Sequence, residues 1–256
     1  MRTKRLRIFA GPNGSGKSVL YEYLLSQKYF NNYFYINADI ITKCLVNGFS
    51  FSNWPINITE SDFFSCLDKS SFKNLLSIAE VRNNLEIIDS VFTWKGNNEN
   101  LTYISAFIAD YVRNLFLSSD SSFTCETVFS HPSKIDFIKQ AKDKGFKVYL
   151  YFIATKNPLI NQGRVENRVM SGGHNVPSEK IKARYYRCLD NLYDAICLCD
   201  RTYLFDNSES KSELSYNNFA EICDGECNIF SDSVPDWFSQ YVYDKLPQNL
   251  YLLLVL

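Results

Sequence analysis

A glycine-rich segment near the start of the chain, GPNGSGKS at residues 11–18, has the residue types and spacing that point most directly to chemistry. It matches the pattern G-x-x-x-x-G-K-[ST], in which backbone N–H groups turn inward around a phosphate and side chains would block the approach. The lysine of such a loop reaches the β- and γ-phosphate oxygens, and the final hydroxyl can ligate Mg²⁺. The segment therefore predicts a site for a nucleoside triphosphate. The residues expected to hold the nucleotide are Gly11, Pro12, Asn13, Gly14, Ser15, Gly16, Lys17 and Ser18, with Ser18 as the metal ligand.

The residues on either side of this loop indicate how it is held. LRIFA at residues 6–10 is a short apolar run, which is typical of a buried parallel strand. After Ser18 the apolar residues recur at helical spacing, so a strand, a glycine loop and a helix follow in order. The positive N-terminal end of that helix would face the same phosphates.

Two acidic residues stand where the expected strands end or turn polar. Asp39 follows the apolar run at residues 33–36, and ligands of open α/β sheets gather beyond the carboxyl ends of strands. There Asp39 could accept the proton of an attacking hydroxyl, or it could cap the helix that follows. Glu126 lies within the otherwise apolar or small-residue segment FTCETVF, where a buried carboxylate is costly without a partner. We favour a ligand contact for Glu126 over a structural ion pair.

Four arginines are candidates for neutralising the transferred phosphate. Arg164 and Arg168 are four residues apart and share one face of a helix, where they could clamp a phosphate or simply face solvent. Arg184 and Arg187 leave the same two alternatives open. His174, in the glycine-containing segment SGGHNVPS, could belong to a lid, although a loop histidine without a function is more common.

The loop alone does not separate the classes of protein that use it. ABC transporter ATPases need an LSGGQ-type signature and an Asp-Glu pair after an apolar strand, whereas the SGG at residues 171–173 continues as His-Asn. The GTPase signature N-K-x-D is absent from the sequence. Asp89, at the end of LEIID, is a minor candidate for a magnesium ligand. These observations favour a kinase over a transporter ATPase or a GTPase.

Strand-like and helix-like segments alternate along the chain, which predicts a three-layer α/β fold with a mainly parallel sheet. We expect one domain over residues 1–256, with residues 43–100 as an insertion or cap after the second strand and 209–256 as a C-terminal extension. The expected strands are residues 6–10, 33–36, 122–129, 147–155 and 202–208. The clearest expected helices are an amphipathic one over 100–119, one over 131–146 and a long one over 178–199.

The overall composition excludes several other classes. A net charge of −1 gives no general electrostatic reason for binding nucleic acid or an anionic membrane. The apolar run LYLLLVL has seven residues, well short of the about 20 that span a bilayer, and we expect a terminal strand or helix end there. No secretion signal is recognisable, so the eight cysteines are expected to be reduced thiols of a cytoplasmic protein.

Taken together, several segments resemble the zeta toxin family of P-loop kinases, in its bacterial zeta-like branch. The resemblance implies a nucleotide-kinase-like P-loop fold and transfer of the γ-phosphate of ATP or GTP to the 3′-hydroxyl of UDP-N-acetylglucosamine. It also implies a small helical antitoxin as a possible partner. The segments that carry it are IFAGPNGSGKS, YINAD, SFTCETVFSH, AKDKGFKVYLYFIAT, RVENRVMSGGHNVPSEKIKARYYRCLDNLYDAI and LFDNS.

The resemblance also implies a role for each matching residue. Lys17 and Ser18 match the phosphate and magnesium positions, and Asp39 matches the aspartate that activates the acceptor hydroxyl. Glu126 and Thr127 match the strand that holds the sugar substrate. Arg164 and Arg168 match the lid region whose arginines contact the transferred phosphate, with Arg184 as a possible second phosphate arginine.

Two alternatives remain open at this point. The acceptor could be a nucleotide, an RNA end or an antibiotic, because the long stretch after Asp39 lies where a substrate would be covered. The chain could also be a non-catalytic nucleotide-binding module, in which the carboxylates of Asp39 and Glu126 are structural.

Overall fold

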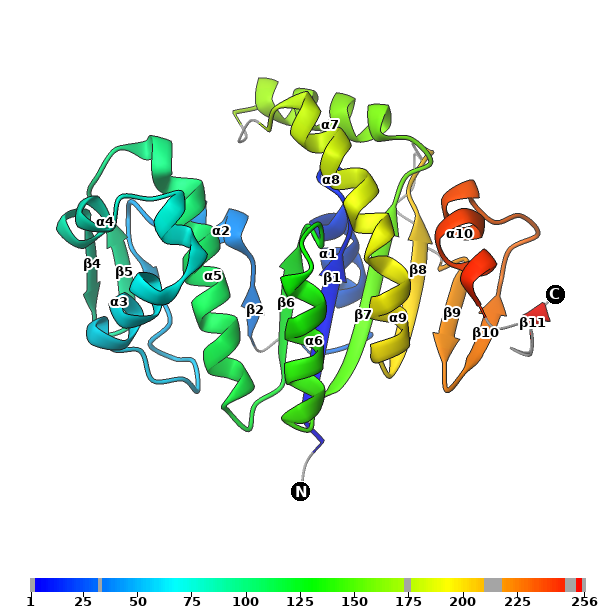
Figure 1. The fold of residues 1–256 in the computed structure, drawn as a ribbon, viewed down its shortest axis with the longest axis horizontal. Coiled ribbons are helices and arrows are strands. Elements are labelled where there is room, and N and C mark those ends of the chain that lie inside the picture. Colours follow the sequence, from blue (N-terminus) through cyan, green and yellow to red (C-terminus); the bar gives the residue numbers. More distant parts are fainter. Residues whose placement is uncertain (1–2, 32–33, 173–175, 210–217, 247–251, 255–256) are drawn as a thin grey trace. The chain divides into compact units, whose positions relative to one another are not determined.

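The computed structural model describes residues 3–31, 34–172, 176–209, 218–246 and 252–254. The chain forms two compact units, one of Met1–Asn32 together with Glu126–Leu256 and one of Tyr33–Cys125. The elements of both are labelled in Figure 1. Among the described residues, no helix is both long and apolar enough to cross a membrane.

The core of the first unit is a run of three parallel strands, β1 (Arg5–Ala10), β7 (Lys147–Ala154) and β8 (Arg201–Asp206). Ile8 pairs with Leu150, which in turn pairs with Thr202. These strands read as nearly continuous apolar runs because helices cover both faces of the sheet. The expected α/β architecture with a mainly parallel sheet is confirmed.

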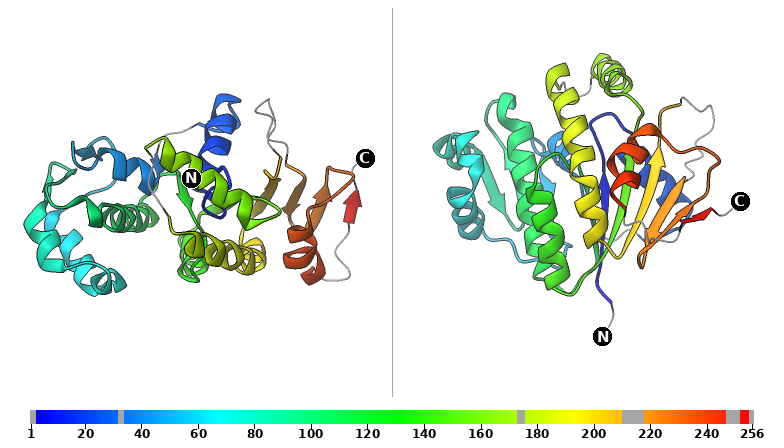
Figure 2. Two further views of the ribbon diagram at one scale, coloured as in Figure 1. Left: turned by 90° about the horizontal axis from the view of Figure 1, so that it is seen from above. Right: turned by 45° about the vertical axis from the view of Figure 1, so that its right-hand side comes forward.

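Helices of the first unit lie on both faces of this sheet (Figures 1 and 2). α1 (Lys17–Ser26) lies on one face, and α6 (Ser133–Asp143) and α9 (Leu192–Leu198) lie on the other. α7 (Pro158–Met170) lies at the carboxyl ends of the parallel strands and packs on α8 (Ser178–Asp190).

The long helix expected over residues 178–199 is wrong in one respect, because it is two helices. α8 ends at Asp190 and α9 begins at Leu192, so that Asn191 caps both. The Asn191 side-chain amide donates a hydrogen bond to the Phe129 carbonyl oxygen at 3.1 Å. This long-range contact at the joint is absent from the local apolar spacing, which continues through the break.

The C-terminal residues of the first unit extend its sheet. β9 (Ala220–Cys223) pairs antiparallel with β8, and β10 (Glu226–Ile229) pairs antiparallel with β9. β11 (Leu252–Leu254) is a terminal strand parallel to β10, while α10 (Asp236–Tyr241) and the 3₁₀ turn η3 (Tyr243–Lys245) precede it. The indole N–H of Trp237 donates to the Asp206 carboxylate at 2.8 Å, which ties α10 to the end of β8.

The second unit is organised around α5 (Leu101–Leu117), close to the amphipathic helix expected over 100–119. α2 (Ala38–Cys44) packs on α5. β2 (Tyr35–Ile36) pairs in parallel with the first part of β6 (Phe123–Thr127), a strand that continues into the first unit.

The stretch expected to be an insertion, residues 43–100, folds as part of the second unit. Its small antiparallel sheet has the order β3 (Phe49–Ser50), β5 (Val91–Trp94) and β4 (Leu85–Ile88). The helical segments around this sheet are α3 (Glu60–Lys69), η1 (Ser71–Asn74), α4 (Ile78–Asn84) and η2 (Asn98–Asn100). Aromatic rings form its core, with Phe92 packed edge-on against both Phe51 and Phe63.

Asp89 does not occupy the place that its weak magnesium assignment requires. It forms, with Ser90, the two-residue turn of the β4–β5 hairpin, and both residues have positive φ angles, of 49° and 63°. Such a turn matches the twist of the two antiparallel strands. Asp89 therefore closes a hairpin instead of ending a buried parallel strand, and the magnesium role suggested for it is wrong.

Candidate active site

The glycine loop runs from β1 into α1, and its backbone needs its glycines. Gly11, Gly14 and Gly16 have φ angles of 147°, 75° and 100°, in the region that residues with a Cβ rarely adopt. A Cβ on Gly11 would come within 2.1 Å of the Ile153 carbonyl oxygen, and one on Gly14 within 2.5 Å of the Asn161 carbonyl oxygen. The loop therefore packs closely on neighbouring backbone while its own backbone bends.

Two asparagines hold the loop by its carbonyl oxygens. The Asn161 side-chain amide, on α7, donates to the Asn13 carbonyl oxygen at 2.7 Å. The Asn207 side-chain amide, just after β8, donates to the Ser15 carbonyl oxygen at 2.8 Å. Asn161 is fully buried, and its side-chain oxygen accepts a hydrogen bond from the Thr155 hydroxyl.

Sequence reasoning missed both asparagines as parts of the site. Asn207 had a usable signal, because it follows a strand of the parallel sheet at the edge where ligands gather. Asn161 had none, because an asparagine inside a helix is ordinary and its partner lies 148 residues away in the chain.

The loop and the start of α1 collect polar groups that suit an anion. The Lys17 ammonium is buried, with 7% of the residue exposed, and donates to the Pro12 carbonyl oxygen at 2.9 Å. The Ser15 hydroxyl is buried without a hydrogen-bond partner among the described residues. α1 has no acidic residue in its first turn to neutralise its positive end. These groups fit the phosphates of a nucleotide.

Glu126 lies next to the residue expected to bind magnesium. The Ser18 hydroxyl donates to one Glu126 carboxylate oxygen at 2.8 Å, and both residues belong to the first unit. Glu126 and Thr127 are half-buried at the carboxyl end of β6, after three fully buried residues. The structure thus brings Glu126 to the loop through Ser18, a contact that the sequence did not indicate.

The structure distinguishes the candidate arginines by their surroundings. Arg164 is half-buried, and its Nη1 atom is buried without a partner among the described residues. Arg168, one turn later on α7, is exposed, as is Arg187 on α8. Arg184 points from α8 to the loop, where its Nη1 donates to the Asn13 side-chain oxygen at 3.3 Å. Two arginines from different helices are therefore parts of this region.

A buried thiol reports the positive charge around the loop. Cys188 on α8 is fully buried and donates to the Val128 carbonyl oxygen at 2.9 Å. Burial raises the pKa of its thiol to about 12, although the nearby charges of Lys17, Arg184 and Arg187 act to lower it. The thiol is therefore neutral at physiological pH and is no nucleophile, since thiolates are the reactive form.

Asp39 belongs to the second unit and is exposed. It lies in the first turn of α2 and does not end β2, which stops at Ile36. It is not the cap of α2 either, because the side-chain oxygen of Asn37 accepts from the Asp39 backbone N–H at 2.8 Å. The expectation that Asp39 could be the helix cap is therefore wrong, and its carboxylate has another role. His174 lies outside the described residues.

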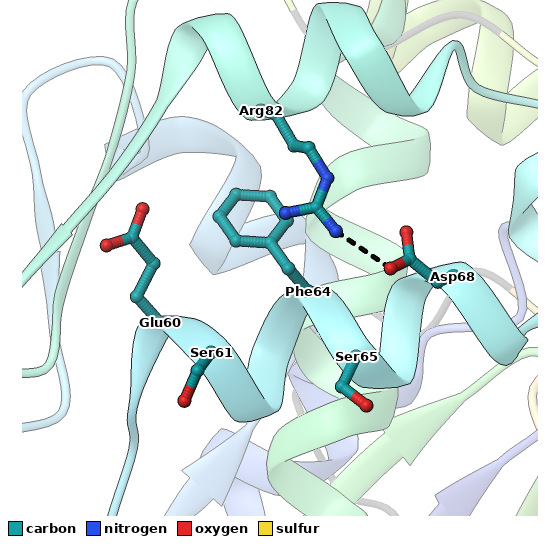
Figure 3. Close-up of a pocket in the computed structure, with 6 residues that line it drawn as sticks. All are labelled: Glu60, Ser61, Phe64, Ser65, Asp68 and Arg82. Carbon is teal, nitrogen blue, oxygen red and sulfur yellow. Dashed lines mark hydrogen bonds and ion pairs between the residues drawn. The ribbon is translucent and has the colours of Figure 1, made fainter.

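The second unit also carries a surface cavity of about 420 Å³ between α3 and α4 (Figure 3). Inside it, the Arg82 guanidinium stacks over the Phe64 ring at 4.5 Å and pairs with the Asp68 carboxylate at 2.8 Å. The cavity includes none of the residues expected to bind nucleotide or acceptor. Its lining residues are Glu60, Ser61, Phe64, Ser65, Asp68 and Arg82.

Comparison with known proteins places the fold. No protein-family model matches the chain. An uncharacterized protein of Haemophilus influenzae is 40% identical over 63 residues, which are 25% of this chain and 45% of that protein. The chain thus spans less than half of this relative.

Two solved structures resemble the chain over nearly its whole length. A crystal structure of the AvrRxo1-ORF1:AvrRxo1-ORF2 complex with ATP matches with a TM-score of 0.56 and 16% identity, over 95% of this chain and 63% of that one. A structure of the PezAT chromosomal toxin–antitoxin system of Streptococcus pneumoniae matches with a TM-score of 0.50 and 12% identity, over 97% of this chain and 82% of that one. The fold is therefore the zeta-toxin-like fold of P-loop kinases.

Proposed function

We propose that this protein is a kinase that transfers the γ-phosphate of Mg·ATP, or of GTP, to a hydroxyl of a small molecule. The observation that carries the proposal is the glycine loop itself, with a buried Lys17 ammonium and an unpartnered Ser15 hydroxyl at its centre. A buried cation and orphaned polar groups are costly unless a ligand satisfies them. The ATP named with the AvrRxo1 complex supports the same assignment.

Each residue of the first unit has a part in holding the donor. The loop N–H groups and Lys17 would bind the β- and γ-phosphates, and the Ser18 hydroxyl would ligate Mg²⁺. The Mg²⁺ supplies charge neutralisation at the phosphoryl oxygens. Arg164 and Arg184 would contact the γ-phosphate, because one has a buried orphan N–H and the other already reaches Asn13. Arg168 remains a lid candidate on the same helix.

The second unit would supply the acceptor chemistry. Asp39 would accept the proton of the attacking hydroxyl, and the exposed first turn of α2 leaves its carboxylate open to a substrate. The leading acceptor is the 3′-hydroxyl of UDP-N-acetylglucosamine, which follows from the sequence resemblance. Glu126 and Thr127 are the residues for which that resemblance implies contact with the acceptor.

We also infer a polypeptide partner that blocks the nucleotide site in the manner of an antitoxin. Both solved relatives are named as complexes or systems of two components, AvrRxo1-ORF1:AvrRxo1-ORF2 and PezAT. Expressing the chain with and without the product of its neighbouring gene tests this. We expect growth arrest without that product and a stable complex with it.

The experiment that tests the proposed function is phosphoryl transfer from γ-labelled ATP to a panel of UDP-sugars, nucleotides, RNA ends and aminoglycosides. We expect label on UDP-N-acetylglucosamine with the wild type and none with Lys17→Ala. Lys180→Ala, an exposed lysine at the start of α8, is the matched control and should transfer normally. Label on a different acceptor would replace the substrate but keep the kinase. ATP binding without transfer to any acceptor would leave a nucleotide-binding module.

A further inference from the structure

We propose that Glu126 acts with Ser18 as the protein part of the magnesium site, as a positioning carboxylate that orients the Ser18 hydroxyl toward the metal. This inference rests on the proposed function, because the metal would arrive with the nucleotide. It gives Glu126 a task different from the acceptor contact that the sequence resemblance implies.

The contact between the two side chains brings together distant parts of the chain. The Ser18 hydroxyl, in the first turn of α1, donates to a Glu126 oxygen at 2.8 Å across 108 residues of sequence. Glu126 comes directly after the buried segment of β6, so a folded strand fixes its position. An acidic side chain at a strand end, bonded to the loop hydroxyl, is the arrangement in which P-loop proteins hold Mg²⁺.

The hydrogen-bond inventory of a hydroxyl explains what the contact does. A serine hydroxyl has one hydrogen and two lone pairs. In this structure the hydrogen is directed at Glu126, which leaves the lone pairs free to face a cation. The carboxylate also makes the hydroxyl oxygen a better ligand, as hydrogen-bonded carboxylates do for histidine ligands of metals.

The rest of the described chain is consistent with a site of this kind. Mg²⁺ usually keeps several waters and takes one or two protein oxygens together with substrate phosphates. Among the residues that the structure describes, no group of three or more His, Cys, Asp and Glu side chains could form a complete metal site. Asp89, the other acidic residue considered for this role, closes a hairpin turn instead.

A purely structural hydrogen bond between α1 and β6 is the competing explanation, and an acceptor contact is the other. The three differ in what Glu126→Gln changes. Glutamine keeps the size of the side chain and an oxygen that accepts from Ser18, but it removes the charge. Only a metal role predicts weaker metal binding with unchanged nucleotide binding in the absence of metal.

The experiment is a titration of Mn²⁺, followed by electron paramagnetic resonance, into the full-length protein with a non-hydrolysable ATP analogue. We expect Glu126→Gln to weaken Mn²⁺ binding about 10- to 100-fold, the range for losing the outer partner of a metal ligand. Analogue affinity measured in EDTA should stay within about twofold of the wild type, which also shows that the variant is folded. Ser18→Ala should lose a similar factor, and the double variant should lose little more, since both changes remove one unit.

Glu166→Gln is the matched control, because Glu166 is exposed on α7 and accepts a hydrogen bond from Gln162. It should leave Mn²⁺ binding unchanged. Normal Mn²⁺ binding by Glu126→Gln would overturn the inference, and a raised KM for the acceptor alone would assign Glu126 to the acceptor instead. No analogue binding by the wild type would overturn the proposed function as well, so the two failures are distinguishable.

Discussion

The two compact units differ in how their candidate site residues are held. In the first, the glycine loop is contacted from α7, from the end of β8 and from α8, and Ser18 is joined to β6. In the second, Asp39 stands exposed in the first turn of a short helix. A densely held loop suits a donor phosphate that binds the same way each time. An open carboxylate suits an acceptor that comes and goes. Nucleotide affinity and transfer rate should therefore respond to different units.

The largest effect should come from Asp39→Asn. Loss of a general base lowers the rate of a chemical step by about 10²- to 10⁴-fold, so we expect a drop of that size in single-turnover transfer. ATP affinity should stay within about twofold of the wild type, because the donor site lies in the other unit. Rapid quench and calorimetry measure the two quantities. A variant that transfers phosphate at the normal rate would remove Asp39 from the mechanism.

The next effect divides the two arginines of α7. Arg164→Ala should weaken ATP binding about 10- to 100-fold, because a buried guanidinium would lose its charge-assisted bonds to phosphate. Arg168→Ala is the matched control on the same helix, and its ATP affinity should change by about twofold or less, because its side chain is exposed. Fluorescence titration with a labelled ATP analogue checks both. Equal losses for the two variants would contradict the distinction drawn between them.

A smaller effect is expected behind the loop. Asn161→Ala leaves the Asn13 carbonyl oxygen without its donor in a buried place, and should cost about 1–3 kcal/mol in the free energy of unfolding. ATP affinity should also fall, because the loop loses a fixed point. Asn167→Ala, an exposed position on the same helix, should change neither quantity. Urea denaturation and the same titration give the measurements; unchanged affinity in Asn161→Ala would show that the loop does not need this support.

The smallest effect concerns the opposite edge of the first unit and should leave both functions intact. Burial alone would raise the pKa of the Asp200 carboxyl, but hydrogen bonds from Lys142 and from the Val148 N–H outweigh it and hold the pKa below its ordinary value of 3.8. A lowered pKa in the folded state stabilises the protein above the ordinary pKa. This stabilisation disappears as the pH falls through the folded-state pKa.

Asp200→Asn should therefore reduce the free energy of unfolding by about 1 kcal/mol at pH 7, since the pair is partly exposed. The difference from the wild type should shrink as the pH falls below about 4. Denaturant titrations at several pH values measure it. A difference that does not change with pH would show that the carboxylate charge is not the cause, and a change in ATP affinity would show that this edge and the loop are coupled.

Local features of the sequence predicted the loop, the parallel strands and the amphipathic α5, because each depends on residues close together in the chain. The glycines of the loop need positive φ angles, and that requirement is visible in the pattern itself. The break at Asn191 was not predictable, because it depends on a hydrogen bond to Phe129. The small sheet of the second unit was also missed, since its strands are short and separated by helices.

The site followed the same division. Lys17 and Ser18 could be named from the motif alone, whereas their environment depends on contacts across the fold. The bond between Ser18 and Glu126 spans 108 residues, and that between Asn207 and Ser15 spans 192. Spacing along a helix placed Arg164 and Arg168 on one face but could not tell the buried side chain from the exposed one. Burial is a property of the packed structure.

The most direct test of the account is calorimetric titration of Mg·ATP into the wild type and into Lys17→Ala. The account predicts one bound ATP per chain for the wild type, and an affinity lower by at least about tenfold for the variant, because a buried ammonium would lose its phosphate partners. Equal affinities, or no ATP binding by the wild type, would contradict the claim that the glycine loop is the donor site of a kinase.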